Sequence, residues 1–124
     1  MNEILNPITT AQGEVLPLDW GRITWLVTGS MRNSAHLTFG RVTINPGAKN
    51  PVHRHPNCEE LLYVVSGRIE HSLGTERFVM NAGDAIVIPA NVWHNAAALD
   101  GAGAELIICF SSADRQTESQ RGEA

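Results

Sequence analysis

Short runs of apolar residues, separated by turn-forming residues, recur along most of this chain. β-branched and aromatic residues are concentrated in segments 22–28, 36–44, 60–67, 85–88 and 105–111. Glycine, proline and asparagine separate these segments at intervals of about 8–12 residues, a spacing typical of β-sandwiches and barrels. No segment longer than about ten residues carries an apolar stripe with helical spacing. The pattern predicts an all-β domain of roughly eight to ten short strands.

Three local signals refine this prediction. Segments 68–73 and 76–80 read as a hairpin closed by Gly74 and Thr75, and segment 92–97 reads as a further strand. Asn91, in the turn before that strand, tolerates left-handed backbone geometry. Gly40 lies inside the predicted strand 36–44 and indicates a bend or bulge there.

The two ends of the chain differ from the middle. Residues 1–17 form an arm broken at Pro7, Gly13 and Pro17, with enough apolar side chains to dock on a second subunit. Residues 18–112 are predicted to form the barrel domain. Residues 113–124 are polar without an apolar period and are predicted to be a mobile tail. We expect one domain, because 124 residues are too few for two.

Composition excludes several partner classes from the prediction. The formal net charge is -4 and Lys49 is the single lysine, which argues against a nucleic-acid-binding surface. No stretch approaches the ~20 apolar residues needed to span a membrane, and the first residues do not resemble a signal peptide. The two cysteines, Cys58 and Cys109, lack the spacing of a paired motif. A cytoplasmic location is therefore expected, with no nucleic-acid or membrane partner.

The polar residues with the clearest chemistry are histidines. His53 and His55 are separated by one residue, so on an extended strand both point to the same side and Arg54 points away. A carboxylate follows after a short turn, as Glu59 or Glu60, and His94 lies on a later strand. Imidazoles and a carboxylate that converge from neighbouring strands favour a divalent metal site. Four such ligands leave two positions open on an octahedral ion.

The spacing of these residues resembles the two motifs of the cupin family. The first motif is matched by Gly47, five residues, His53-x-His55, four residues, Glu60, six residues and Gly67. The second is matched by Gly83, five residues, Pro89-x-Asn91, two residues and His94. The resemblance implies metal ligands at His53, His55, Glu60 and His94. The chain departs from the family pattern at Asn91, where Gly is usual, and at Ala98, where Asn is usual, and neither position is a ligand in the family.

The resemblance also implies a fold and a range of functions. It implies a small jelly-roll β-barrel (a double-stranded β-helix), a homodimer, and one divalent transition metal per chain among Mn, Fe, Ni, Zn, Co and Cu. The expected function is an enzyme that acts on a small oxygenated substrate of sugar-acid, keto or enol type. Lewis-acid or O₂ chemistry would make it an isomerase, lyase or dioxygenase. The alternative is a non-catalytic binding or sensing module with a structural metal.

The remaining candidates are assigned weaker roles. We expect Cys58 to be a thiol of the interior rather than a ligand, and Cys109 to be a core residue. His36 and His71 are expected on the wall or the surface, with proton transfer near the metal as a secondary possibility. Arg41 would hold a ligand carboxylate if its strand face lined the cavity. Asn95 lies on the face opposite His94 and is not assigned to the site, and no catalytic residue is assigned.

Overall fold

The computed structural model describes residues 6–120 of the chain. Within this range it contains one short 3₁₀ helix, η1 (Thr10–Gln12), and eleven strands. The strands are β1 (Glu14–Leu18), β2 (Gly21–Val27), β3 (Thr38–Ile44), β4 (His53–Arg54), β5 (Glu60–Ser66), β6 (Arg68–Leu73), β7 (Glu76–Asn81), β8 (Ala85–Ile88), β9 (His94–Ala98), β10 (Ala104–Phe110) and β11 (Glu118–Ser119).

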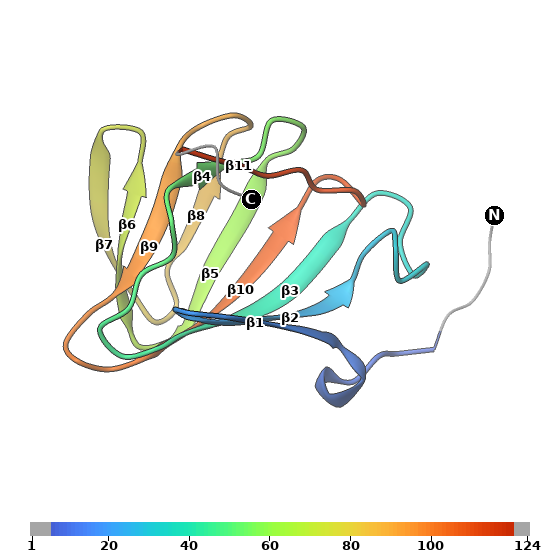
Figure 1. Ribbon diagram of the computed structural model, residues 1–124, viewed down its shortest axis with the longest axis horizontal. Coiled ribbons are helices and arrows are strands. Elements are labelled where there is room, and N and C mark those ends of the chain that lie inside the picture. Colours follow the sequence, from blue (N-terminus) through green and yellow to red (C-terminus); the bar gives the residue numbers. More distant parts are fainter. Residues whose placement is uncertain (1–5, 121–124) are drawn as a thin grey trace.

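The strands form two antiparallel sheets that lie face to face (Figure 1). The six-stranded sheet has the order β1-β2-β3-β10-β5-β8, and the five-stranded sheet has the order β11-β4-β9-β6-β7. Neighbouring strands are far apart in sequence, as where β10 lies between β3 and β5. The all-β prediction is confirmed.

Side-chain alternation decides which residues fill the space between the sheets. On β5, Glu60, Leu62 and Val64 are buried, whereas Leu61 and Tyr63 are 47% and 41% exposed. This is the period of two expected for a strand with one buried face. The core is built from Val42, Ile44, Cys58, Leu62, Val64, Ile69, Met80, Ile88, Ala96, Ala98, Ala104, Leu106, Ile108 and Phe110.

Most predicted elements are present, and one is displaced. The hairpin forms as β6 and β7, β8 has the predicted bounds, and Asn91 has a positive φ of 69°. The irregularity predicted at Gly40 lies instead on the neighbouring strand, between Trp25 and Val27 of β2. Gly40 serves a different purpose, because a Cβ there would stand 2.7 Å from the Trp25 ring. The missing side chain makes room for the indole.

The two ends of the chain join the sheets. In the arm, β1 pairs with β2 in an antiparallel register, and its docking on a second subunit stays a prediction. Residues 1–5 of the arm lie outside the described residues. Beyond residue 112, where only a polar tail was expected, β11 pairs with β4, and Arg54 Nε lies 2.8 Å from Glu118 Oε1. The predicted domain boundaries themselves stay predictions.

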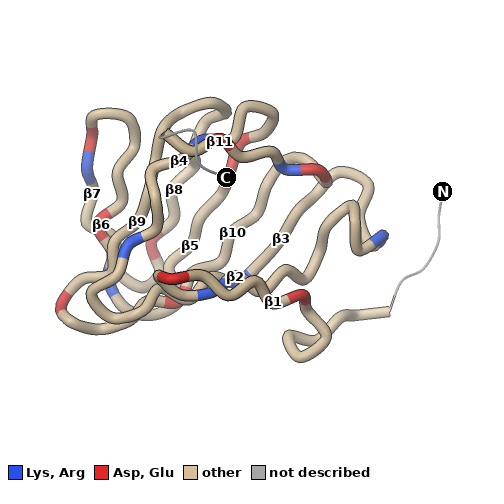
Figure 2. The backbone as a smooth tube through the Cα atoms, viewed as in Figure 1, with Lys and Arg blue, Asp and Glu red and all other residues tan. Residues whose placement is uncertain are grey.

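Charged residues of both signs lie interspersed at the loops and strand ends (Figure 2). The ion pairs Arg68–Asp100 and Arg77–Glu70 are examples on the five-stranded sheet and its edge. In residues 6–120, no helix has the length and apolar character needed to cross a membrane. The cytoplasmic location stays a prediction.

Candidate metal centre

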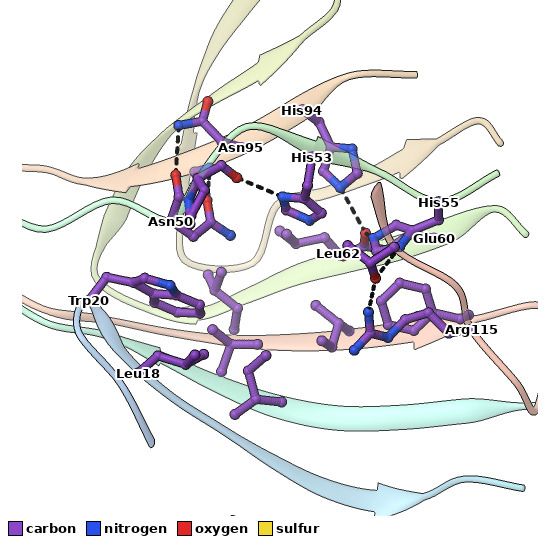
Figure 3. A pocket seen from close by; sticks show the side chains of 18 of the residues that line it. Leu18, Trp20, Asn50, His53, His55, Glu60, Leu62, His94, Asn95 and Arg115 are labelled. Carbon is purple, nitrogen blue, oxygen red and sulfur yellow. Dashed lines mark hydrogen bonds and ion pairs between the residues drawn. The ribbon is translucent and has the colours of Figure 1, made fainter. Parts of the chain in front are cut away.

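Three strands bring the four predicted ligands together between the sheets. His53 lies on β4 with His55 directly after it, Glu60 begins β5, and His94 begins β9. His53 is the register partner of His94, which places their ring centroids 4.2 Å apart. One potential ligand atom from each of the four residues lies within 4.8 Å of the others. Figure 3 shows the four side chains converging on one end of a cavity.

The side chain between the two histidines points away from this cluster, as the alternation of a strand predicts. The Arg54 guanidinium lies 4.2 Å from the centre of the Trp93 ring. It also pairs with Glu118 of β11. Arg54 therefore ties β4 to the C-terminal segment and leaves the interior to His53 and His55.

Each of the three imidazoles is oriented by a backbone carbonyl. His53 Nδ1 lies 2.7 Å from the Pro51 oxygen, His55 Nδ1 lies 2.9 Å from the Gln116 oxygen, and His94 Nδ1 lies 2.9 Å from the Val92 oxygen. A carbonyl can only accept, so in each ring Nδ1 carries the proton. Each Nε2 atom is then unprotonated and carries a free lone pair, which is the form in which a histidine binds a metal.

The ligand atoms at the centre of the cluster are all hydrogen-bond acceptors, and a cation among them would be favourable. Glu60 Oε1 lies 3.2 Å from His55 Nε2 and 3.1 Å from His94 Nε2. With Nδ1 protonated, all three of these atoms are acceptors, and buried acceptors facing one another are unfavourable without a positive charge among them. The three nitrogens and one carboxylate oxygen form a set that could hold one divalent transition metal, and they fit Mn, Fe, Co, Ni, Cu or Zn without choosing among them.

Burial and neighbouring charges keep these groups in the form that binds a metal. Burial, together with the nearby His94 ring, lowers the pKa of His53 to about 4. Burial alone would raise the pKa of Glu60, but the His55 and His94 rings beside its carboxylate lower it to about 2. At neutral pH, His53 is therefore neutral and Glu60 is ionised.

A second buried histidine gives the metal-free protein a pH dependence. Burial and the His94 ring also lower the pKa of His71 to about 4. Between pH 6.5 and about 4 the unfolded chain binds protons at His53 and His71 that the folded chain does not, so stability must fall as the pH falls through this window. Each histidine contributes up to about 3 kcal/mol at the usual 1.36 kcal/mol per pKa unit.

Urea denaturation of chelator-treated protein from pH 7 to pH 4 measures this loss. His71→Leu removes one of the two groups, and we expect its loss of unfolding free energy over the window to be about half that of the wild type. Glu60 adds to this loss only at the acid end of the window, because its lowered pKa removes stability as the pH falls from about 4.5 toward 2. A free energy of unfolding that is constant from pH 7 to pH 4 would contradict the buried, neutral state of both histidines.

The cluster opens on a cavity of about 330 Å³ between the sheets. Its walls are largely aliphatic and aromatic, and its polar groups are gathered at the metal end and the rim. The lining residues include Leu16, Leu18, Trp20, Ile23, Trp25, Val42, Asn50, Leu62, His71, Asn95, Ala96, Leu106, Ile108, Phe110, Arg115 and Thr117. The arrangement presents the four polar ligand groups to any small molecule that enters this largely apolar chamber.

The C-terminal segment supplies part of the site, which the sequence did not predict. The Gln116 carbonyl orients His55, and Thr117 Oγ1 lies 3.2 Å from the same Nδ1. Asn57 holds the segment with two hydrogen bonds: its Nδ2 donates to the Asp114 oxygen (2.9 Å), and its Oδ1 accepts from the Gln116 nitrogen (3.0 Å). A polar segment without apolar period gives no signal that it will contact a buried histidine.

The cysteines and the two remaining histidines lie outside the ligand cluster, at different depths in the fold. Cys58 is buried, as expected, and burial raises the pKa of its thiol, which disfavours the thiolate needed for a ligand. Cys109 was expected in the core but alternates outward on β10 and is only half-buried. His36 is exposed on the surface. His71 is a fully buried wall residue, stacked on His94 with 6.0 Å between ring centroids.

Two polar residues near the cavity also differ from expectation. The strand face that carries Arg41 does not line the cavity, because the alternate residue Val42 does, and Arg41 Nη2 lies 3.7 Å from Glu105 Oε1. Asn95, left out of the site, lines the cavity at the rim, where its Nδ2 donates to the Asn50 oxygen.

Comparisons with known proteins agree with this geometry. The family model described as the cupin domain matches residues 40–110. Germin-like protein 3-8 of Oryza sativa subsp. japonica is 34% identical over 64% of this chain and 38% of its own length. An uncharacterized protein of Methanocaldococcus jannaschii is 30% identical over 85% of this chain and 78% of its own. The chain thus spans well under half of the germin-like protein.

Solved structures show the same fold. Bacillus subtilis oxalate decarboxylase superposes with a TM-score of 0.81 at 21% identity, over 90% of this chain and 31% of that one. The Lactobacillus farciminis oxalate decarboxylase gives a TM-score of 0.81 at 20% identity, over 89% of this chain and 34% of that one. The two-sheet architecture is therefore the jelly-roll barrel that the sequence predicted.

Proposed function

The chain belongs to the cupin family, and on this premise we propose that it is a metal-dependent enzyme that acts on a small oxygenated substrate. The observation that carries the proposal is the set of four ligand atoms within 4.8 Å of one another, with three imidazoles fixed by backbone carbonyls. The adjoining cavity supports it, because it gives a small molecule direct access to the open side of that set.

His53, His55, Glu60 and His94 would hold one divalent transition metal. When bound, such an ion supplies Lewis acidity toward a carbonyl, enol or carboxylate oxygen, and a redox-active ion supplies O₂ chemistry. The protein's contribution is to keep the three Nε2 atoms deprotonated and aimed inward. The aliphatic walls lower the local dielectric constant, which strengthens the electrostatic interactions at the ligand groups.

Named relatives indicate which reactions to test. A gentisate 1,2-dioxygenase of Ralstonia is 28% identical over 74% of this chain and 28% of its own length. One solved structure of Bacillus subtilis oxalate decarboxylase concerns the Mn(II) centres of that enzyme. These relatives point to oxidative or decarboxylating chemistry on small acids, with manganese as the first metal to load. Iron is the second, because it is redox-active and suits the same ligand set.

Turnover of small acids by the metal-loaded protein tests this proposal. Protein loaded separately with Mn²⁺ and Fe²⁺ is incubated with oxalate, gentisate and a series of 2-oxo acids, while O₂ uptake is recorded and products are identified by mass spectrometry. We expect product from at least one acid with wild-type protein and none with a His94→Ala variant that retains the fold. Thermal stabilisation by the acids without product from any of them would contradict an enzyme and support a binding module.

Asn57 should affect metal affinity through the C-terminal segment. Asn57→Ala removes both hydrogen bonds that hold residues 114 and 116, and so loosens the carbonyl that orients His55. Loss of such an outer partner typically weakens metal binding by about 10–100-fold. We expect a loss of about 10-fold, measured by competition with a chelator of known affinity.

A matched control for Asn57 exists elsewhere in the chain. Asn33 makes the same two kinds of bond, with Nδ2 to the Leu26 oxygen (2.8 Å) and Oδ1 from the Thr28 nitrogen (3.0 Å), in a loop that contains no ligand. Asn33→Ala should leave metal affinity unchanged. Equal effects of the two substitutions would show that any loosened loop lowers affinity and would contradict the role of Asn57.

We also propose a homodimer. Its support is an apolar outer face on the six-stranded sheet, where Leu61, Tyr63, Val65 and Val87 are all exposed and lie on the adjacent strands β5 and β8. Apolar side chains clustered in this way commonly mark an interface between proteins. Sedimentation equilibrium should give twice the chain mass for the wild type and a single chain mass for Val87→Asp, whereas a monomeric wild type would contradict the proposal.

A further inference from the structure

We propose that Arg115 is the carboxylate-binding residue of the cavity, and that the ligand is a small carboxylic acid with an apolar body. The inference deepens the proposed function and rests on it for the role of the metal end. It comes from four observations: the place of this side chain, its unused hydrogen-bond donors, its unmatched charge and the chamber that it faces.

The place of Arg115 is set by two aromatic rings. Its guanidinium carbon lies 4.6 Å from the centre of the Trp25 ring and 5.2 Å from that of Phe110. Both rings belong to the six-stranded sheet and line the cavity, and the Phe110 ring also contacts His55 edge-on at 4.9 Å. Figure 3 shows Arg115 at the same end of the cavity as His55 and Glu60, away from Leu18 and Trp20.

Most N–H donors of the Arg115 guanidinium have no acceptor among residues 6–120. An arginine has five N–H donors in one plane, and stacking on aromatic faces does not use them. In the described part of the chain, the hydrogen bond made by Arg115 runs from Nη1 to Thr117 Oγ1. Thr117 in turn contacts His55 Nδ1, so the guanidinium group of Arg115 lies beside the candidate metal centre. Donors remain for a bidentate contact with a carboxylate.

The charge of Arg115 is also unmatched. Arg41, Arg54, Arg68 and Arg77 each have a carboxylate oxygen within 4.0 Å, and all these pairs lie near the surface. Arg115 is half-buried and, among residues 6–120, has no carboxylate oxygen within that distance. Burial lowers the pKa of the guanidinium, with Glu60 acting in the opposite direction, yet arginine stays charged at neutral pH. A partly desolvated cation without an anion favours an anionic ligand.

The chamber in front of Arg115 selects the rest of the ligand. Aliphatic side chains from five strands of the six-stranded sheet form its walls: Leu18, Ile23, Val42, Leu62, Leu106 and Ile108. A sugar acid would bury hydroxyl groups against these walls without partners, at a cost for each group. The volume of 330 Å³ equals about ten water molecules at roughly 30 Å³ each. A branched 2-oxo acid of six carbons fits within this volume and matches the polarity of the chamber.

Calorimetric titration of the metal-loaded full chain with two matched probes tests the inference. The probes are 4-methyl-2-oxopentanoate and its neutral amide, which share the apolar body and the 2-oxo group. We expect wild-type protein to bind the acid at least 10-fold more tightly than the amide, because a charge-assisted hydrogen bond is worth about 1.5–3 kcal/mol. In Arg115→Gln, the acid should lose about 10–100-fold and the amide less than 2-fold. Arg115→Lys should restore part of the preference for the acid.

The controls separate ligand binding from a structural role. Arg41→Gln removes an arginine of the outer face and should change neither affinity. Equal losses of acid and amide in Arg115→Gln would show that Arg115 only holds the C-terminal segment, and that result would overturn the proposal. An absence of preference for the acid in the wild type would overturn it without any variant, including the case in which Arg115→Gln fails to fold.

A titration of chelator-treated protein separates this inference from the metal proposal. The probes there are 4-methylpentanoate and its amide, which lack the 2-oxo group. A preference for the acid that persists without metal and disappears in Arg115→Gln supports Arg115 even if the chain proves to bind no metal. Metal binding with no preference for the acid in either form of the protein leaves the metal proposal intact and overturns the role of Arg115.

Discussion

Replacing His94 with alanine is expected to lower the metal content of the purified protein from near one ion per chain to below about a tenth. His94 supplies one of three imidazoles, and its Nε2 lies 3.1 Å from Glu60 Oε1 at the centre of the cluster. Loss of an outer partner of a ligand costs about 10–100-fold in affinity, so loss of a ligand itself should cost more than about 100-fold. Elemental analysis and chelator competition measure the two quantities.

A thermal readout adds to this test of His94. A metal that binds the folded chain alone raises its melting temperature, and adding a chelator should reverse the effect in the wild type and do nothing in His94→Ala. The matched control is His36→Ala, since His36 is exposed and outside the cluster. Unchanged metal affinity in His94→Ala would contradict the assignment of this ligand.

Phe110→Ala is expected to cause the largest loss of stability among the single substitutions considered. Phe110 is 2% exposed, ends β10 and faces Trp25 with 6.2 Å between ring centroids. Truncating a buried phenylalanine removes its burial and leaves a cavity, which costs about 3–5 kcal/mol. Because the ring also supports His55 and the Arg115 guanidinium, metal affinity should fall in the same variant.

Urea denaturation of chelator-treated protein compares this variant with Phe78→Ala. Phe78 is 44% exposed on β7, and its truncation should cost less than about 1 kcal/mol. If Phe110→Ala lost as little unfolding free energy as Phe78→Ala, the two sheets would not depend on this ring for their packing.

The candidate metal ligands could be predicted because their signal lies in local spacing. His53 and His55 are one residue apart on an extended segment, so strand geometry alone places both on one side. The distance from His55 to Glu60 and the later motif around His94 matched the family pattern, and the family model covers that region. The choice of Glu60 over Glu59 also agrees with the burial alternation on β5.

The C-terminal contribution could not be predicted for a physical reason. The segment contacts the site through backbone groups, such as the Gln116 carbonyl, and is held by hydrogen bonds to the Asn57 side chain. Such contacts need no apolar period, so the segment resembles a solvated tail in sequence. Arg115 was missed in the same way, because its partners Trp25 and Phe110 come from strands that meet it only in the fold.

The misplaced bulge at Gly40 has a similar origin. A glycine inside a strand signals that something comes close to the backbone, but the sequence does not say what. Here the Trp25 ring of the neighbouring strand occupies that space, and the extra residue lies on β2. The position of Arg41 depended on the same unknown, because a bulge in β3 would have turned its side chain toward the cavity.

The measurement that tests the central claim most directly is the metal content per chain of protein purified without oxygen and without added metal-binding tags. We predict close to one divalent transition metal per chain, restored to that value when the chelated protein is supplied with Mn²⁺ or Fe²⁺. Less than about a tenth of an ion per chain, with no uptake of any first-row divalent metal, would contradict a metal centre at His53, His55, Glu60 and His94.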